Sequence, residues 1–309
     1  MMLRVPFLSP GQAQFEIRTN QHGEMQMATT SVDAANDSNG NYQLGYTNLE
    51  HERLIRQAAR IAPYTERLFR EAGVGPGQRV LDLGSGLGDV SLLLARIVGS
   101  SGEVVGIERD GRSIARANAR VAEAGLRNVS FTQCDVNEIA SAQPFDAAVG
   151  RFILMFLPDP ASVLRALTGL VRPGGVLAFQ EPTWIPLLAS GARLPLWSKL
   201  LQAIHETFVR SRINPEMGIA LYRLFQEVGL PAPAMHAETP MGSDANFTGL
   251  ICDLIRSVRP MAEQHDVPLD ALGDFETLSD RIQAEIAAAK TVVSFVPLVG
   301  VWARKPAGG

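Results

Sequence analysis

The sequence has only two cysteines and no cluster of basic residues. These absences argue against a disulfide-stabilised protein, a cysteine-ligated metal site and a nucleic-acid-binding protein. Two cysteines among 309 residues, Cys134 and Cys252, cannot build a disulfide framework, and neither has metal-ligand spacing. We therefore expect free thiols, a reducing cytoplasmic location and no metal site. Lys and Arg residues are not clustered, and the formal net charge is −4. Because binding a polyanion needs several cations on one face, we expect no nucleic-acid partner.

Long apolar runs are also absent. No run approaches the ~20 residues that span a bilayer, so we expect no membrane partner. The opening MMLRVPFLSP has no apolar stretch typical of a signal peptide. Residues 1–40 are polar, aperiodic and rich in Gly, Asn and Ser, which predicts a disordered N-terminal arm. Met27 is an alternative start to Met1 within this arm.

Beyond the arm, apolar patterns alternate between strand and helix. Residues 41–75 predict a helical cover that breaks or kinks at Pro63. Over residues 76–182, the strand patterns RVLDLG, GEVVGIE, VSFTQCD, FDAAVGRF and VLAFQEP are separated mostly by helical ones. This order is typical of βαβ units and predicts an α/β fold with a mostly parallel sheet. Residues 183–309 predict a helical cap followed by final strands that complete the sheet.

The most informative stretch is VLDLGSGLGDVS, a strand that ends in a glycine turn and leads into a helix. Gly84, Gly86 and Gly88 lack a Cβ, so the chain can turn sharply and bring its amides close to a ligand. A helix N-terminus also favours an anionic group. Glu108 closes the next strand and Asp135 the third, and the ends of parallel strands meet at one edge of a sheet. The pattern predicts a nucleoside cofactor.

Five segments together resemble the motifs of the class I S-adenosylmethionine-dependent methyltransferases, of the UbiE-like, small-molecule type. They are VLDLGSGLGDVS, GIERD, QCDV, FDAAVGRFILMFLPDP and VRPGGVLAFQEP, and the resemblance covers roughly residues 42–182. It implies a Rossmann-like, seven-stranded, mostly parallel sheet with helices on both faces and a helical cap from C-terminal insertions. It also implies S-adenosyl-L-methionine as the cofactor and S-adenosyl-L-homocysteine as its product.

The resemblance assigns cofactor binding to residues at the ends of the strands. These residues are Asp82, Gly84, Ser85, Gly86, Glu108, Arg109, Asp135, Val136 and Arg151. Glu108 is expected at the ribose hydroxyls, Asp135 and the Val136 amide at the adenine, and Arg109 stacked on the ring. Alternatives remain: Asp82 orients the loop without touching the cofactor, and Asp135 caps the following turn. Arg151 either meets an anionic group or forms an ion pair with Glu181 or Asp146.

The acceptor is less well defined than the cofactor. Methyl transfer from a sulfonium depends on alignment and exclusion of water, so a dedicated base is not required. If the acceptor is a hydroxyl, His205 and Glu181 are the candidate catalytic bases, with His236 as a further candidate. Tyr42, Tyr46 and Trp197 are the candidate substrate contacts, although plain packing of the cover helix explains Tyr42 and Tyr46 at least as well.

The cap is rich in apolar residues, which favours a small, fairly apolar acceptor over a macromolecule. Three alternatives remain: a methyltransferase acting on a macromolecule, a protein of this fold that catalyses another reaction such as a cyclisation, and an NAD dehydrogenase. The oligomeric state is open, and a homodimer is among the expectations.

Overall fold

The computed structural model describes residues 17–19, 25–27, 48–190 and 193–307. The chain divides into two units, Met1–Asn41 and Tyr42–Gly309, so the division falls next to the predicted end of the N-terminal arm. In the first unit, β1 (Ile17–Thr19) and β2 (Met25–Met27) form an antiparallel pair. This short hairpin lies in the segment predicted to be disordered, and the rest of that prediction lies outside the described residues.

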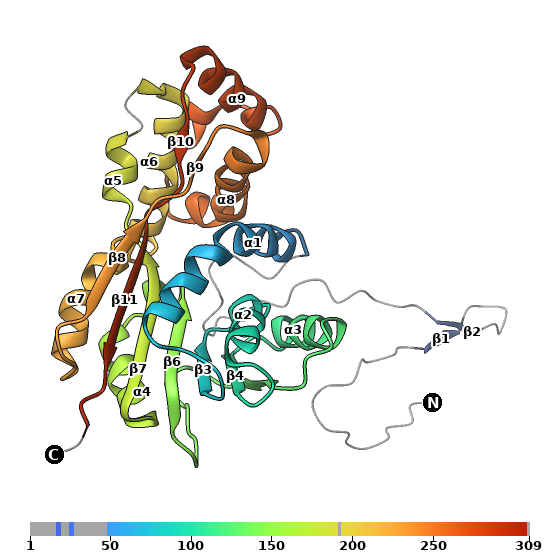
Figure 1. The fold of residues 1–309 in the computed structure, drawn as a ribbon. Coiled ribbons are helices and arrows are strands. Elements are labelled where there is room, and N and C mark those ends of the chain that lie inside the picture. The colour runs from blue at the N-terminus through green and yellow to red at the C-terminus, as the bar shows by residue number, and fades with distance from the viewer. Residues whose placement is uncertain (1–16, 20–24, 28–47, 191–192, 308–309) are drawn as a thin grey trace. The chain divides into compact units, whose positions relative to one another are not determined.

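The second unit is built on a seven-stranded sheet with the order β5-β4-β3-β6-β7-β11-β8 (Figure 1). Its strands are β3 (Arg79–Leu83), β4 (Glu103–Glu108), β5 (Val129–Gln133), β6 (Phe145–Arg151), β7 (Val171–Pro182), β8 (Ala234–Glu238) and β11 (Leu298–Arg304). The first five of these pair in parallel, whereas β11 runs antiparallel between β7 and β8. The predicted seven-stranded, mostly parallel sheet is therefore confirmed.

Successive strand residues belong to two different apolar clusters. Val80 and Val149 pack with helices on one face, while Leu81 and Phe179 pack with helices on the other. The helices of the first face are α1 (Asn48–Glu71), α2 (Asp89–Val98) and α3 (Gly111–Glu123). Those of the second face are α4 (Pro160–Leu170) and α7 (Met217–Glu227). Because both faces are covered, the central strands have nearly continuous apolar sequences rather than alternating ones.

Four helices form the cap at one end of the sheet (Figure 1). They are α5 (Ile185–Ser190), α6 (Pro195–Arg210), α8 (Ala245–Gln264) and α9 (Leu278–Ala289), with the 3-10 turn η3 (Asp270–Leu272) between the last two. Next to the cap, β9 (Met241–Gly242) and β10 (Val293–Ser294) form a separate antiparallel pair. The assignment of all helices after residue 183 to the cap was wrong for α7, which packs on β7 and β11.

Helix α1 connects the cap to the sheet. It continues through Pro63 as one helix, and Figure 1 shows that it bends along its length. Proline removes one backbone N–H donor and crowds the preceding turn, which explains the bend. The first part of α1 lies against α8, where Arg56 pairs with Asp253 at 2.8 Å, and Leu68 and Phe69 in the second part pack with α2.

No helix among the described residues has the length and apolar character needed to cross a membrane.

Candidate active site

The turn Gly84–Gly88 joins β3 to α2 and forms the centre of the site. Gly84, Gly86 and Gly88 have φ values of 63°, 52° and 80°, a left-handed conformation that favours glycine. A Cβ on Gly84 would lie 2.6 Å from Cδ1 of Ile153. A Cβ on Gly86 would have no heavy atom of the described residues within 4 Å. The turn is therefore packed at Gly84 and open at Gly86.

The Glu108 carboxylate lies beside the open part of this turn. Its Oε2 accepts the Gly86 N–H at 3.0 Å, and its Oε1 accepts the N–H groups of Arg109 at 2.9 Å and Asp110 at 3.0 Å. The side chain is half-buried at the end of β4. These backbone bonds fix the carboxylate in one orientation next to the amides of the turn.

Asp82 lies beneath the turn and is 1% exposed. Its Oδ2 accepts the Ser91 hydroxyl at 2.6 Å, which ties β3 to α2. Burial raises the pKa of Asp82 to about 7, and the bond from Ser91 and the positive charge of Arg151 act in the opposite direction. This arrangement favours the alternative in which Asp82 orients the loop. Ser85, within the turn, is buried, and its hydroxyl has no hydrogen-bond partner in the described part of the chain.

Asp135 follows β5, whose end lies beside that of β4 because the Cys134 N–H donates to the Glu108 carbonyl at 3.0 Å. The Asp135 Oδ1 accepts the backbone N–H of Asn137 at 2.9 Å and its side-chain amide at 2.7 Å. Asp135 therefore does cap the following turn, as one alternative predicted, and its second oxygen makes no hydrogen bond to any described residue. Val136 is half-buried against the core.

Arg151 stands at the end of β6, next to the glycine turn. Leu83 and Gly150 are paired in the register of β3 and β6, so Arg151 is level with Gly84. Its Nη1 donates to Oγ1 of Thr65 at 3.1 Å. Burial lowers the pKa of Arg151, while Asp89 and Asp82 oppose this shift.

The predicted ion pair between Arg151 and Glu181 or Asp146 was wrong. Asp146 instead accepts the Arg79 backbone N–H at 2.7 Å and pairs with Arg172 at 2.6 Å, near the start of the strands. Glu181 accepts backbone amides, and it lies on the opposite face of the sheet from Arg151 because successive strand residues alternate between the faces. No carboxylate among the described residues lies within ion-pair distance of Arg151.

Glu181 holds the loop that follows β6. It is 0% exposed, and its Oε1 accepts the N–H groups of Ile153 at 3.0 Å and Leu154 at 2.8 Å. These amides begin the 3-10 turn η1 (Leu154–Phe156). Burial raises the pKa of Glu181 to about 7, against the effect of the backbone amides, and its Oε2 has no hydrogen-bond partner in the described part of the chain.

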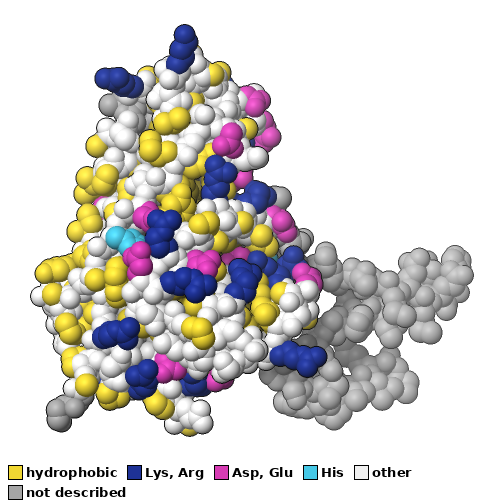
Figure 2. Space-filling model, in the orientation of Figure 1, with side chains coloured by type: hydrophobic (Ala, Val, Ile, Leu, Met, Phe, Trp, Pro, Cys, Tyr) yellow, Lys and Arg dark blue, Asp and Glu magenta, His cyan; other side chains and the backbone are white. Residues whose placement is uncertain are grey.

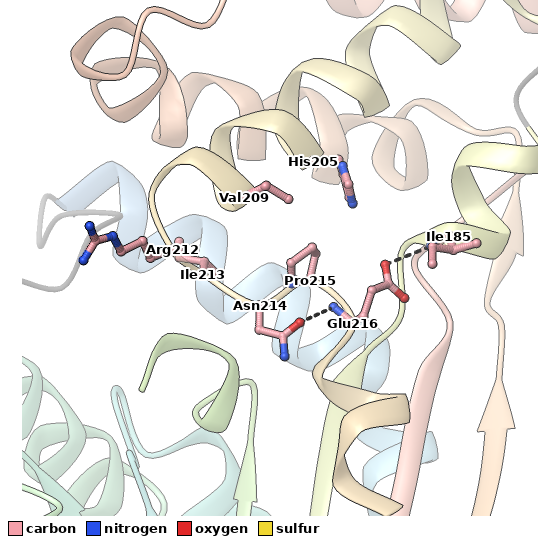
Figure 3. A pocket seen from close by; sticks show the side chains of 8 residues that line it. All are labelled: Ile185, His205, Val209, Arg212, Ile213, Asn214, Pro215 and Glu216. Carbon is pink, nitrogen blue, oxygen red and sulfur yellow. Dashed lines mark hydrogen bonds between the residues drawn. The ribbon is translucent and has the colours of Figure 1, made fainter. Parts of the chain in front are cut away.

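His205 lies in the cap, in a cleft of about 460 Å³ between α5, α6 and the segment before α7 (Figure 3). The cleft is lined by Ile185, His205, Val209, Arg212, Ile213, Asn214, Pro215 and Glu216. Burial lowers the pKa of His205, which favours the neutral imidazole. The Asn214 N–H donates to the Met155 carbonyl at 2.9 Å. The loop 152–157 therefore contacts the cleft through Met155 and the glycine turn through Ile153.

The remaining predicted residues lie elsewhere. Trp197 is 1% exposed in the apolar core of the cap, so its contact with a substrate stays a prediction that this packing does not favour. His236 is on β8, at the far edge of the sheet, where it contacts Glu71 at 3.1 Å. The side chain of Arg109 is exposed. Tyr42 and Tyr46 lie outside the described residues.

Sequence reasoning missed three side chains that shape the site. Arg120 of α3 donates to the Leu87 carbonyl at 2.6 Å and to Asp89 at 2.7 Å, which secures the glycine turn from outside. Ser91 binds Asp82, and its position early in α2 was an available signal. Thr65 carried no signal, because nothing in its helix marks it as a partner of Arg151.

Among the residues described, no group of three or more His, Cys, Asp or Glu side chains is arranged to hold a metal ion.

Comparison with known proteins gives a consistent result. Residues 75–229 match a family model described as a methyltransferase domain. The ubiquinone/menaquinone biosynthesis C-methyltransferase UbiE of Cellvibrio japonicus is 30% identical over 208 residues, which cover 61% of this chain and 78% of that protein. An arsenite methyltransferase of Aquipseudomonas alcaligenes is 40% identical over 113 residues, or 34% of this chain, and the match spans only 33% of that relative's length.

A solved structure from Bacillus halodurans, with a provisional methyltransferase name, has a TM-score of 0.51 at 18% identity. The match covers 78% of this chain and 98% of that chain, and it shows the shared fold alone.

Proposed function

This chain belongs to the class I S-adenosylmethionine-dependent methyltransferases, and from this premise we propose that it methylates a small, fairly apolar organic acceptor by in-line displacement. The observation that carries the proposal is the Glu108 carboxylate beside the open Gly86 at the end of neighbouring parallel strands. A ribose presents hydroxyl donors, and the Glu108 Oε2, which among the described residues accepts only the Gly86 N–H, keeps a lone pair that can accept one of them.

The other residues at this edge of the sheet fit the remaining parts of the cofactor. When bound, S-adenosylmethionine supplies a methyl group activated by a sulfonium. We assign the glycine turn at Gly84, Ser85 and Gly86, with Arg151, to its amino acid end, because the helix N-terminus that follows the turn and the guanidinium both favour an anion. Asp82 supports the turn from below through Ser91.

The adenine assignment rests on the segments that follow β4 and β5. Asp135 has a carboxylate oxygen that makes no hydrogen bond to the described residues, and the amide of Val136 follows it directly. Arg109 is exposed immediately after Glu108, where its side chain can stack on a flat ring.

The nature of the acceptor is supported by the cap and by the relatives. Ile185, Val209, Ile213 and Pro215 give the cleft of the cap an apolar lining, with His205 as a polar group (Figure 3). The UbiE relative is named as a C-methyltransferase of ubiquinone and menaquinone biosynthesis, which agrees with an organic acceptor. The two free thiols, Cys134 and Cys252, agree with the cytoplasmic location that we propose. A homodimer stays a prediction.

If the acceptor is a hydroxyl, Glu181 and His205 are the candidate bases. Near neutral pH His205 is in its proton-accepting form because burial lowers its pKa, whereas Glu181, with a pKa of about 7, is divided between its protonated and proton-accepting forms. Glu181 uses one oxygen to hold the loop after β6, which favours a structural contribution alongside any proton transfer.

Two measurements test the proposed function. Calorimetry should detect binding of S-adenosylhomocysteine and no binding of NAD. The reverse result would contradict the assignment of S-adenosylmethionine as the cofactor. Tritium from methyl-labelled S-adenosylmethionine should then appear in small, organic-extractable acceptors. Label in protein or nucleic acid would indicate a macromolecular acceptor, and tight cofactor binding with no transfer to any acceptor would favour another reaction. Glu108→Ala serves as the impaired control, and Glu103→Ala, at the other end of β4, as its match.

A further inference from the structure

A chain of three side chains connects β6, α1 and β7 beneath the bend of α1. The Arg151 Nη1 donates to the Thr65 Oγ1 at 3.1 Å, and the Thr65 hydroxyl donates to the Gln180 Oε1 at 2.6 Å. Thr65 and Gln180 are 0% exposed. Because the 2.6 Å bond to Gln180 is much shorter than the 3.2 Å contact to the Ile61 carbonyl, the single hydroxyl proton goes to Gln180. Thr65 can therefore only accept from Arg151.

The sheet register places this chain on the face covered by α1. Arg151 and Gln180 are paired directly in the register of β6 and β7, so their side chains emerge on the same face. The Asp82 side chain lies on this face too. Asp82 comes two residues after Val80 in β3, so both side chains point to the same face, and Val80 packs with α1 and α2. The guanidinium thus stands between the carboxylate under the glycine turn and the hydroxyl of α1.

Arg151 and Gln180 keep donors that form no hydrogen bond with the described residues. A guanidinium has five N–H groups, and only the bond to Thr65 is formed by Arg151 with described residues. The Gln180 Nε2 is also buried without an acceptor among them. An unbonded buried donor such as the Gln180 Nε2 is costly, and the half-buried Arg151 keeps N–H groups that bond to no described residue, so this arrangement favours a bound group with several acceptor oxygens. A carboxylate has that chemistry, and Arg151 is level with Gly84 of the turn.

We propose that Thr65 and Gln180 are positioning residues that hold the Arg151 guanidinium toward the carboxylate of the cofactor's amino acid end. The proposal rests on the proposed function and adds a role for α1. Through Thr65, α1 fixes the orientation of the Arg151 guanidinium. The packing of α1 on the sheet and the recognition of the cofactor carboxylate therefore depend on each other.

Thr65→Val and Thr65→Ser form the matched pair that tests this role. Valine keeps the shape of threonine and removes the hydroxyl, whereas serine keeps the hydroxyl. Calorimetry would compare S-adenosylhomocysteine with its decarboxylated analogue, S-adenosyl-3-thiopropylamine, which lacks only the carboxylate. We expect Thr65→Val to weaken S-adenosylhomocysteine about tenfold, the scale of one hydrogen bond to a charged group, and to leave the analogue within about twofold. Thr65→Ser should bind both ligands like the wild type.

A double-mutant cycle with Arg151→Met gives a second measurement that does not depend on the analogue. Once Arg151 is replaced, Thr65→Val should have no further effect on S-adenosylhomocysteine. If Thr65→Val folds poorly, Gln180→Met takes its place in the test and should give the result expected of Thr65→Val. Equal weakening of both ligands, or the same Thr65→Val effect with and without Arg151, would mean that Thr65 only stabilises the fold. Failure of the wild type to bind S-adenosylhomocysteine would instead overturn the proposed function.

Discussion

The carboxyl ends of the parallel strands form the edge of the sheet that carries the site, called here the site edge. Its two halves differ in how far apart in the sequence their contacting residues lie. At the ends of β3, β4 and β5, the contacts are short in sequence: Glu108 reaches Gly86 across 22 residues and Asp82 reaches Ser91 across 9. At the ends of β6 and β7, Glu181 holds the Ile153 amide across 28 residues, but Thr65 reaches Gln180 across 115 residues and Arg151 across 86. The first half is secured by its own turn, and the second depends on α1 being in place.

The halves meet where Ile153 covers Gly84. Its Cδ1 would lie 2.6 Å from a Cβ at that position, and Glu181 holds the Ile153 amide from the other face of the sheet. A change at Gly84 therefore disturbs both halves, whereas a change at Gly86 affects the turn alone. This difference gives the largest effect that we expect.

Gly84→Ala and Gly86→Ala should differ in stability. Both place alanine at a left-handed φ, which costs about 1–2 kcal/mol. Gly84→Ala also pushes against Ile153, and overpacking costs typically about 1–3 kcal/mol more. Urea unfolding should therefore show a loss of about 2–5 kcal/mol for Gly84→Ala and about 1–2 kcal/mol for Gly86→Ala. Adding Ile153→Val should recover part of the loss in the first variant only, and equal losses in the two variants would contradict the contact.

Glu108→Ala tests the first half through the ligand. We expect binding of S-adenosylhomocysteine to weaken by about 1.5–3 kcal/mol, the range for hydrogen bonds to a charged group. Glu103→Ala removes an exposed carboxylate from the other end of β4 and should leave the affinity unchanged. Calorimetry at constant salt measures both, and unchanged binding by Glu108→Ala would remove Glu108 from the site.

The same contrast explains how much the sequence could predict. The glycine turn, Glu108 and the parallel sheet follow from local patterns, because their contacts form within βαβ units of neighbouring strands. Arg151 was recognised by position, but its partner was not, since Thr65 looks like any helix residue until the fold brings β6 and α1 together. The placement of α7 against the sheet could not be separated from the cap for the same reason: helical periodicity shows which face is apolar and not what it packs against.

Each half also buries one carboxyl group, and this predicts the effect of pH on stability. Burial raises the pKa of Asp82 from 3.8 and that of Glu181 from 4.5, in each case to about 7. An acid whose pKa is raised by folding binds protons more tightly in the folded state. Its favourable contribution is complete below the unfolded pKa and is lost as the pH rises through the folded pKa, with a slope of about 1.4 kcal/mol per pH unit between the two values.

We therefore expect the free energy of unfolding of the wild type to fall between about pH 4 and pH 8. Glu181→Gln keeps an oxygen for the amides of Ile153 and Leu154 but cannot ionise, so its pH dependence should be flatter than that of the wild type. Asp82→Asn removes the other buried acid and should also flatten the pH dependence of the free energy of unfolding. Urea unfolding across this range measures the slopes, and a wild-type stability that rises toward pH 8 would contradict the assignment.

The smallest effect is expected where α1 meets the cap through exposed charges. Figure 2 shows Lys and Arg side chains interspersed with Asp and Glu on one face of the molecule, an arrangement in which each pair competes with water. Arg56 pairs with Asp253 of α8 at 2.8 Å, but the Arg56 side chain is 55% exposed. Arg56→Gln should therefore cost only about 0.2–1 kcal/mol, and the cost should shrink in about 0.5 M salt because exposed charges are screened. If this variant instead reduced S-adenosylhomocysteine affinity as strongly as Thr65→Val, the attachment of α1 to the cap, rather than the hydroxyl beneath its bend, would govern the direction of Arg151.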